Sequence, residues 1–285
     1  MFKLKDFFKL LRVEQWYKNI VIFIPIIFSL NFLNGKYLLL TILGFLSLCF
    51  LSSSYYIIND IVDLEKDKNH PEKKKRPLAL GIISKKSAGI ISLILFFISI
   101  IIGYFLSIYF FYLLIVLFSL SQLYTFYIRK IEFLDIIVIS INFVIKAVCG
   151  AFIINVPSSY WVILCIFFIS LFLVSLKRSS ETALKNVEKY RSSIKPADKI
   201  IFDNLSIVSL VCTFVFFCIY SILHNKPGLL LGLPLSLYIV FDYLKSTHNN
   251  PDIARNPEKF IFNKKTIIVF ILWGLITIIS FYIYR

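Results

Sequence analysis

The sequence contains little glycine and little charge. Only 9 of its 285 residues are glycine, and Asp, Glu, Lys and Arg together make up 16%. Hydrophobic residues make up 59%, with 30 phenylalanines among them, and the mean hydropathy is +0.83. The apolar residues fall in long runs and do not alternate with polar ones. This pattern excludes an ordinary soluble domain and predicts membrane-spanning helices.

The sequence also lacks the paired cysteine spacing of a metal site or a disulfide framework. Its five cysteines all lie inside apolar runs, where disulfides do not form readily. They are therefore interpreted as small core residues. Their positions are Cys49, Cys149, Cys165, Cys212 and Cys218.

Nine apolar runs are long enough, or nearly so, to cross a bilayer. They lie at about 19–34, 37–58, 88–106, 110–127, 134–154, 161–176, 204–223, 228–244 and 266–283. Backbone polar groups must be paired within the bilayer, so the runs predict an all-α fold, a polytopic membrane helical bundle in a single domain, 1–285. The basic stretch 1–18 is not followed by a small-residue cleavage site, so the first helix is expected to be retained.

The net charge of +15 is concentrated in alternate loops. With the N-terminus in the cytoplasm, 27 of the 31 Lys and Arg residues fall on cytoplasmic segments and three on the opposite side. The positive-inside rule therefore predicts a multi-pass protein of the cell (inner, cytoplasmic) membrane with its N-terminus, long loops and active site facing the cytoplasm. Topology and membrane lipid account for the charge without a nucleic-acid partner.

Three aspartates follow one another at the end of the second run, Asp60, Asp63 and Asp67. If the helix continues, their spacing places them on one face. Carboxylates so close repel one another without a cation, and hard oxygen ligands suit Mg²⁺, which bridges to phosphate oxygens. The pattern predicts a Mg²⁺ site, and the alternative is a solvated acidic helix end.

A basic stretch, 73–76, follows and ends at Pro77. A metal on one edge of a diphosphate and fixed cations on the other would neutralise it. Arg76 is the favoured phosphate contact, and Lys74 is a further candidate. The lysines could instead only set topology or bind anionic lipid.

The string Asn59-Asp60-x-x-Asp63-x-x-x-Asp67 resembles the first Asp-rich motif of the UbiA-type intramembrane prenyltransferase superfamily. Its continuation is similar to the branch that includes decaprenyl-phosphate phosphoribosyltransferase. The residues that carry this second resemblance are His70-Pro71, Lys73, Arg76-Pro77, Gly81, Gln15–Asn19, Leu134-Asp135, Lys146, Gly150-Ala151, Lys177-Arg178, Glu181, Pro257-Glu258 and Trp273.

The loop after the sixth run lacks the second Asp-rich motif that UbiA-type enzymes acting on aromatic acceptors usually carry. It opens with Lys177-Arg178, and its acids, beginning with Glu181, do not repeat the aspartate pattern. Fixed positive charge in place of a second metal suits an anionic ligand such as a lipid monophosphate.

The resemblance implies a membrane transferase that moves a 5-phosphoribosyl group from phosphoribosyl pyrophosphate to a polyprenyl phosphate and releases pyrophosphate. It implies Mg²⁺ as cofactor, held by Asn59, Asp60, Asp63 and Asp67. The expected catalytic residues are Asp60, Asp63, Lys177 and Arg178. The expected substrate-binding residues are Lys18, Asn19, Asn59, His70, Lys74, Arg76, Lys146 and Glu181. The reaction requires no protein nucleophile, and the sequence offers no candidate for one.

Lys146 lies about twelve residues into the fifth run. A charge at that depth usually faces a cavity, so a ligand phosphate contact is favoured over an internal ion pair. The related branch has arginine here, and lysine gives up the bidentate geometry of arginine. Lys18 and Asn19, at the start of the first run, are either phosphate contacts or part of an interface anchor with Trp16.

Two other functions stay open. A conventional UbiA prenyltransferase would transfer a prenyl group from a prenyl diphosphate to an aromatic or other small acceptor, and the missing second motif argues against it. A transporter or lipid-binding scaffold would rarely need a carboxylate ladder beside a basic loop. The sequence is compatible with a monomer or an oligomer.

Overall fold

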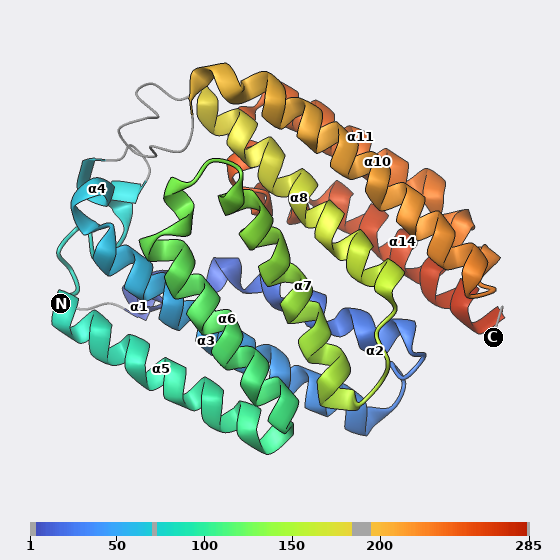
Figure 1. Ribbon diagram of the computed structural model, residues 1–285, viewed down its shortest axis with the longest axis horizontal. Coiled ribbons are helices and arrows are strands. Elements are labelled where there is room, and N and C mark those ends of the chain that lie inside the picture. The colour runs from blue at the N-terminus through green and yellow to red at the C-terminus, as the bar shows by residue number, and fades with distance from the viewer. Residues whose placement is uncertain (1–3, 70–72, 184–194, 284–285) are drawn as a thin grey trace. The chain divides into compact units, whose positions relative to one another are not determined.

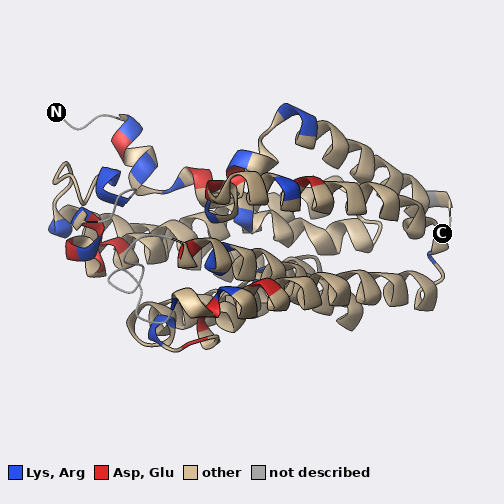
Figure 2. Cartoon of the chain, turned by 90° about the horizontal axis from the view of Figure 1, so that it is seen from above, with Lys and Arg blue, Asp and Glu red and all other residues tan. Residues whose placement is uncertain are grey.

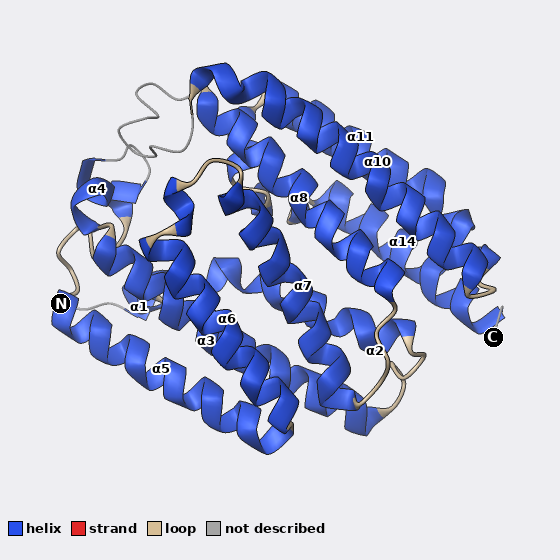
Figure 3. Cartoon of the chain, in the orientation of Figure 1, coloured by secondary structure: helices blue, strands red, loops and turns tan. Residues whose placement is uncertain are grey.

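The computed structural model of the chain describes residues 4–69, 73–183 and 195–283, and these residues form helices and loops with no strand (Figures 1 and 3). The predicted all-α class is confirmed. The chain divides into two compact helical units, 1–157 and 158–285. The single domain predicted over 1–285 stays a prediction.

The first unit contains ten helical elements. They are α1 Leu4–Leu10, η1 Val13–Phe23, α2 Ile24–Phe28, α3 Gly35–Val62, α4 Leu64–Asn69, η2 Lys73–Lys75, α5 Lys85–Leu106, α6 Ile108–Phe126, η3 Ile128–Lys130 and α7 Leu134–Ile154. The elements of the second unit are α8 Tyr160–Thr182, η4 Pro196–Asp198, α10 Lys199–Leu223, η5 Pro227–Gly232, α11 Leu233–Asn249, α12 Pro251–Arg255, α13 Glu258–Ile261 and α14 Lys264–Ile283.

Among the described residues, eight helices are long and apolar enough to cross a membrane. They correspond to the second through ninth predicted runs, most within a few residues at each end. Many of their large apolar side chains point outward; Phe105, for example, is 80% exposed and Tyr160 82%. Outward apolar faces are what lipid solvates, so the chain is a multi-pass membrane protein.

The first predicted span, 19–34, is wrong as a regular helix. The helical path begins earlier, at Val13, and ends at Phe28, so only five residues of it are α-helical. Pro25, at the start of α2, cannot donate a backbone hydrogen bond. Leu30 then takes a left-handed conformation (φ 59°), which turns the chain out of the helix before residue 34.

The element η1 nevertheless runs antiparallel to α3 over most of its length. The hydroxyl of Ser53 donates to the Leu11 carbonyl at 2.7 Å, just before η1, and the ring of Phe23 packs on Phe45 at its other end. The side chain of Arg12 extends from the start of η1 along α3 and reaches Asp60.

Helix α3 packs on α5 through buried serines. Ser47 pairs with Ser99, and Ser54 pairs with Ser92, each with Oγ atoms 3.0 Å apart. Small hydroxylated residues let two membrane helices approach closely while each hydroxyl keeps a partner. Figure 1 shows α5 lying along α3.

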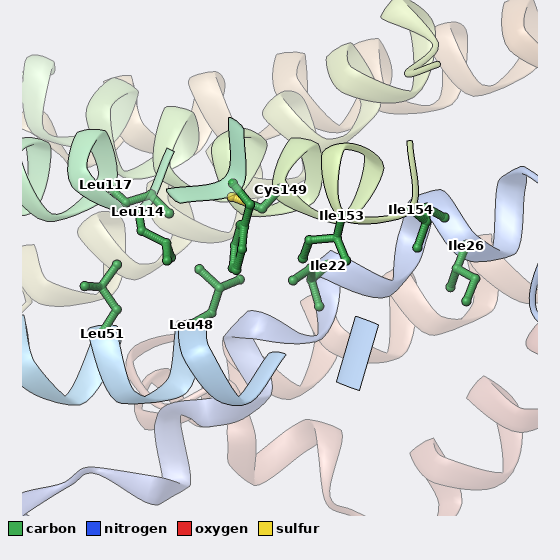
Figure 4. Packing of buried hydrophobic residues seen from close by; sticks show 10 residues of the cluster. Ile22, Ile26, Leu48, Leu51, Leu114, Leu117, Cys149, Ile153 and Ile154 are labelled. Atoms are coloured by element: carbon green, nitrogen blue, oxygen red, sulfur yellow. The ribbon is translucent and has the colours of Figure 1, made fainter. Parts of the chain in front are cut away.

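The core of the first unit is apolar and is built from η1, α2, α3, α6 and α7. Figure 4 shows Leu48 and Leu51 of α3 facing side chains of the other elements. Gly150 lets α7 approach η1, because a Cβ atom there would lie 2.0 Å from the carbonyl oxygen of Ile22. This contact sets the position of α7 relative to η1, and so the position of the polar residues that α7 carries.

Candidate functional site

The acidic motif lies where α3 passes into α4. Asp63 caps α3 with a backbone conformation (φ −90°, ψ 5°) outside the helical range. The helical path still continues, because the Asp63 amide donates to the Asn59 carbonyl at 2.9 Å and the Asp67 amide donates to the Asp63 carbonyl at 2.8 Å. The exposed fractions of Asp60, Asp63 and Asp67 are 4%, 7% and 2%, so a solvated helix end is excluded.

Arginines neutralise all three buried carboxylates. Arg12 bonds to both carboxylate oxygens of Asp60, with Nε 3.3 Å from Oδ2. Arg76 bonds to Asp60, with Nη1 2.9 Å from Oδ1, and also to Asp67. Three guanidinium groups and three carboxylates thus form one charge-balanced group, called the Arg–Asp cluster below. The third guanidinium belongs to Arg129, which bonds to Asp63.

The third arginine, Arg129, comes from η3, after α6. It donates to Asp63 and, at 3.3 Å, to the side-chain oxygen of Asn59. The other Asp63 oxygen, Oδ1, is buried and has no hydrogen-bond partner among the described residues. Figure 2 shows acidic and basic residues close together near the N-terminus. An unpartnered buried carboxylate oxygen is a ready ligand for a cation.

The backbone of Arg12 is held in an unusual conformation. Its φ of 51° and ψ of 45° lie in the left-handed region, which is costly for a residue with a side chain. The guanidinium lies over the ring of Tyr56, 5.0 Å from the centroid, and bonds to Asp60. Such strain persists where surrounding contacts over-determine it, which is common at functional sites.

Burial also changes the acidity of two cluster members outside the membrane-spanning helices. Burial raises the pKa of Asp67, and the charges of Arg76 and Lys73 oppose this effect without cancelling it. Burial and the neighbouring Arg12 lower the pKa of Arg76, against the pull of the two aspartates. These directions describe charges held with little water around them.

The carboxylate and amide oxygens of the motif are of the ligand type that Mg²⁺ prefers. Among the described residues, no three His, Cys, Asp or Glu side chains are placed to hold one metal ion together. Mg²⁺ at phosphate sites commonly uses only one or two carboxylates and takes its other ligands from water and the substrate. The unpartnered Oδ1 of Asp63 satisfies that requirement.

Several predicted site residues of the first unit lie elsewhere. Lys18 bonds to the side chain of Gln15. Asn19 is completely buried, and its amide bonds to Cys49 and Ser52 of α3, at 3.3 and 3.2 Å. These contacts join η1 to α3, and the predicted substrate roles of Lys18 and Asn19 stay predictions.

The remaining predicted residues of the first unit have different surroundings. Lys74 is exposed in η2, and Lys146 is buried in α7. His70 lies outside the described residues. The three roles stay predictions.

The predicted residues of the second unit lie at the end of α8. Arg178 is 2% exposed and bonds to Glu181, with Nη1 2.7 Å from Oε2. Its neighbour Lys177 lies on the same final turns of the helix. Ser179 donates to Asp203 of α10 at 2.5 Å, which ties the two helices together at this end. The catalytic and binding roles of the three predicted residues stay predictions.

The family model described as UbiA prenyltransferase family matches residues 22–265. The chain belongs to this family. The match covers both helical units, the Asp-rich motif and the end of α8, and it places the chain among transferases. The resemblance stated from the sequence is confirmed at the level of the family.

The chain is similar in sequence to two curated relatives. The decaprenyl-phosphate phosphoribosyltransferase of Mycolicibacterium smegmatis is 29% identical over 65% of this chain and 62% of its own length. A protein of Sinorhizobium fredii known as y4nM, of uncharacterized function, is 27% identical over 92% of this chain and 53% of its own length. The chain therefore spans between half and two thirds of the length of these relatives.

Solved structures show the same fold. A UbiA homolog from Archaeoglobus fulgidus bound to GPP and Mg²⁺ has a TM-score of 0.67 at 17% identity, covering 96% of this chain and 99% of that one. A structure of digeranylgeranylglyceryl phosphate synthase also has a TM-score of 0.67, at 21% identity, covering 98% and 99%. At these identities the likeness concerns the fold alone.

Sequence reasoning missed Arg12 and Arg129 as members of the site, because both were counted only as topological charges. The scarcity of arginine in the sequence could have identified both residues. Seven of the 31 basic residues are arginine, and the first unit contains only three, Arg12, Arg76 and Arg129. All three bind the aspartates. Arginine is favoured over lysine where planar, paired contacts to carboxylates or phosphates are made.

Proposed function

We propose that this chain transfers a 5-phosphoribosyl group from phosphoribosyl pyrophosphate to a polyprenyl phosphate, with Mg²⁺, and releases pyrophosphate. The observation that carries the proposal is the Arg–Asp cluster, in which three guanidinium groups surround carboxylates with one unpartnered oxygen. The name of the mycobacterial relative supplies the substrate class. The positive-inside distribution supports a cytoplasmic active site in the cell membrane.

The chemistry is a substitution at the anomeric carbon of the ribose. An oxygen of the lipid phosphate forms a bond to that carbon, and the bond to the pyrophosphate oxygen breaks, with the electron pair leaving on pyrophosphate. When bound, Mg²⁺ supplies charge neutralisation to the leaving group. The protein supplies positioning and further positive charge, and no residue of the chain needs to form a covalent bond.

The cluster residues have separate tasks in this reaction. Asp60 and Asp63, with Asn59 and Asp67 beside them, would hold the metal on the donor diphosphate. Arg12, Arg76 and Arg129 would exchange their carboxylate partners for diphosphate oxygens as the metal takes over the carboxylates. Planar guanidinium groups are suited to both partners. In the second unit, Lys177 and Arg178 would bind the phosphate of the lipid.

The test is transfer of radiolabel from phosphoribosyl pyrophosphate into an organic phase containing a polyprenyl phosphate, with purified protein in detergent. Asp63→Asn keeps the side-chain shape and is expected to lower the rate at least about 100-fold. Glu65→Gln is the matched control, because Glu65 is an exposed acid two residues away whose carboxylate bonds to Lys68. Chelation of Mg²⁺ should stop transfer by the wild type.

No labelled lipid from the wild-type protein with any polyprenyl phosphate would contradict the proposal. Activity found only with a prenyl diphosphate and an aromatic acid would assign the chain to the conventional prenyltransferases. Equal activity of Asp63→Asn and Glu65→Gln would remove the cluster from the mechanism.

A further inference from the structure

Lys146 is a buried cation without a buried anion. It lies in α7, its exposed fraction is 4%, and it makes no ion pair or hydrogen bond with any described residue. Its ammonium nitrogen lies 5.5 Å from the centroid of the Phe143 ring. An internal ion pair, the alternative raised from the sequence, is therefore absent from the part of the chain that the structure describes.

The groups around this ammonium are weak or neutral. Tyr56 and Cys49 of α3 and Cys149 of α7 are its ionisable neighbours, and none is a carboxylate. Asn142 precedes Lys146 by one turn on the same face of α7, and its buried side-chain oxygen has no hydrogen-bond partner. Two adjacent polar groups on one helix face thus lack partners.

The position relative to the Arg–Asp cluster follows from α3. Tyr56 lies one turn before Asp60, and its ring stacks under the Arg12 guanidinium. Cys49 lies three turns before Asp60. Since a helix rises about 1.5 Å per residue, the ammonium lies beside a stretch about 6 to 16 Å below the cluster along α3. This group is therefore separate from the cluster that would hold the diphosphate.

The energetics favour a ligand over a structural role. A charged group in an apolar region is costly unless it is paired, and removal of an unpaired one does not destabilise a fold. Ionisable residues inside membrane proteins usually mark substrate pathways. An ammonium and an amide oxygen together match a phosphate monoester, whose oxygens accept from lysine and whose P–OH, when the phosphate is singly protonated, donates to the asparagine oxygen.

We infer that Lys146, with Asn142, binds the monoester phosphate of a substrate and thereby distinguishes phosphoribosyl donors and lipid monophosphates from prenyl diphosphates. The inference rests on the proposed function. Both proposed substrates carry such a group, as the 5-phosphate of phosphoribosyl pyrophosphate or the head group of the polyprenyl phosphate. A prenyl diphosphate carries none beyond the diphosphate that the metal site holds.

The kinetic test compares Lys146→Met with Lys86→Met, which removes the same charge from an exposed position in α5. Each substrate is varied at saturating concentration of the other. Lys146→Met should raise the KM of one substrate about 10- to 100-fold, the usual effect of losing a hydrogen bond to a charged group. A raised KM for phosphoribosyl pyrophosphate identifies the 5-phosphate, and a raised KM for the lipid identifies its head group. Two unchanged KM values overturn the inference.

A second measurement does not depend on transfer activity. Thermal unfolding is followed in detergent with and without inorganic phosphate for the wild type, Lys146→Met and Lys146→Arg. The inference expects Lys146→Met to unfold no earlier than the wild type without phosphate and to lose the phosphate-induced shift, which Lys146→Arg retains. Earlier unfolding of Lys146→Met, or an unchanged phosphate shift, overturns it. If the wild type transfers no phosphoribosyl group, the proposed function fails while this measurement still decides whether Lys146 binds phosphate.

Discussion

Arg129 donates a hydrogen bond to one carboxylate oxygen of Asp63, while the other oxygen of the same carboxylate is buried without a partner. The contact joins the turn after α6 to the end of α3. It gives Asp63 a cation on one side and leaves the second oxygen for a metal. In the proposed reaction, Arg129 would bind the leaving pyrophosphate as it gains charge.

Arg129→Met is therefore expected to lower kcat/KM about 100-fold, because one donor to a developing negative charge typically contributes that much. Lys130→Met is the matched control, since Lys130 carries the same charge at the next, exposed position. Steady-state label transfer at saturating Mg²⁺ measures kcat/KM for both variants. Equal losses in the two variants would show that only the general positive charge of the turn matters.

Arg76 links Asp60 and Asp67, and in the proposed reaction it would compete with Mg²⁺ for the same carboxylates. Arg76→Met removes one of three cations and leaves the cluster with a negative charge. The stabilising shift in melting temperature caused by Mg²⁺ without substrate should therefore be larger in this variant than in the wild type. The control is Na⁺ at the same ionic strength. A smaller Mg²⁺ shift would mean that Arg76 organises the metal ligands and does not compete for them.

Gly150 is predicted to be the least replaceable glycine of the first unit. Gly150→Ala would place a methyl group 2.0 Å from the Ile22 carbonyl oxygen, and the backbone would have to move. Overpacking of this kind costs about 1 to 3 kcal/mol. Gly89→Ala in α5 has no atom within 4 Å of the new methyl and should be neutral or stabilising by up to ~1 kcal/mol. Denaturation in mixed detergent measures both, and equal effects would contradict the close approach of α7 and η1.

The stability of the second unit should depend on pH through Asp252. Burial opposes ionisation there, but hydrogen bonds from Lys259 and Asn256 outweigh it and lower the pKa of Asp252. A carboxyl whose folded pKa lies below its unfolded value stabilises the fold above the unfolded pKa, near 4, and loses this effect as the pH falls through the folded pKa.

Asp252→Asn should accordingly lower stability by on the order of 1 kcal/mol at pH 7. The difference from the wild type should disappear as the pH falls through the lowered pKa of Asp252 in the folded state. Melting temperatures of both proteins across this range test the prediction. A difference that persists at low pH would show that the loss comes from the shape of the α12 turn and not from the charge.

The sequence predicted eight membrane helices well, because each is an apolar run bounded by polar residues. It failed at the first span, where hydropathy does not distinguish a 3₁₀-helix from an α-helix. Residues 13–23 form a 3₁₀-helix that packs on α3, through contacts such as the ring of Trp16 on Phe50 and the amide of Asn19 on Cys49. Local composition could not supply that tertiary information.

The site was predicted in part. The spacing of Asp60, Asp63 and Asp67 correctly indicated that a helical path continues through them, although the backbone of Asp63 leaves the helical range between α3 and α4. Arg12 and Arg129 were missed because they are 48 and 66 residues distant from their partners in sequence. Contacts over such separations are set by tertiary packing. In the sequence, only the scarcity of arginine indicated them.

The charge balance of the Arg–Asp cluster has a consequence for the biogenesis of the protein. Metalloproteins whose acidic ligands have no other partners often cannot fold until the ion arrives. Here each aspartate already has a guanidinium partner from the same unit, so the polypeptide can be inserted and assembled empty. The supply of the ion and of the phosphoribosyl donor in the cell would then govern when the protein works, and its abundance would be independent of both.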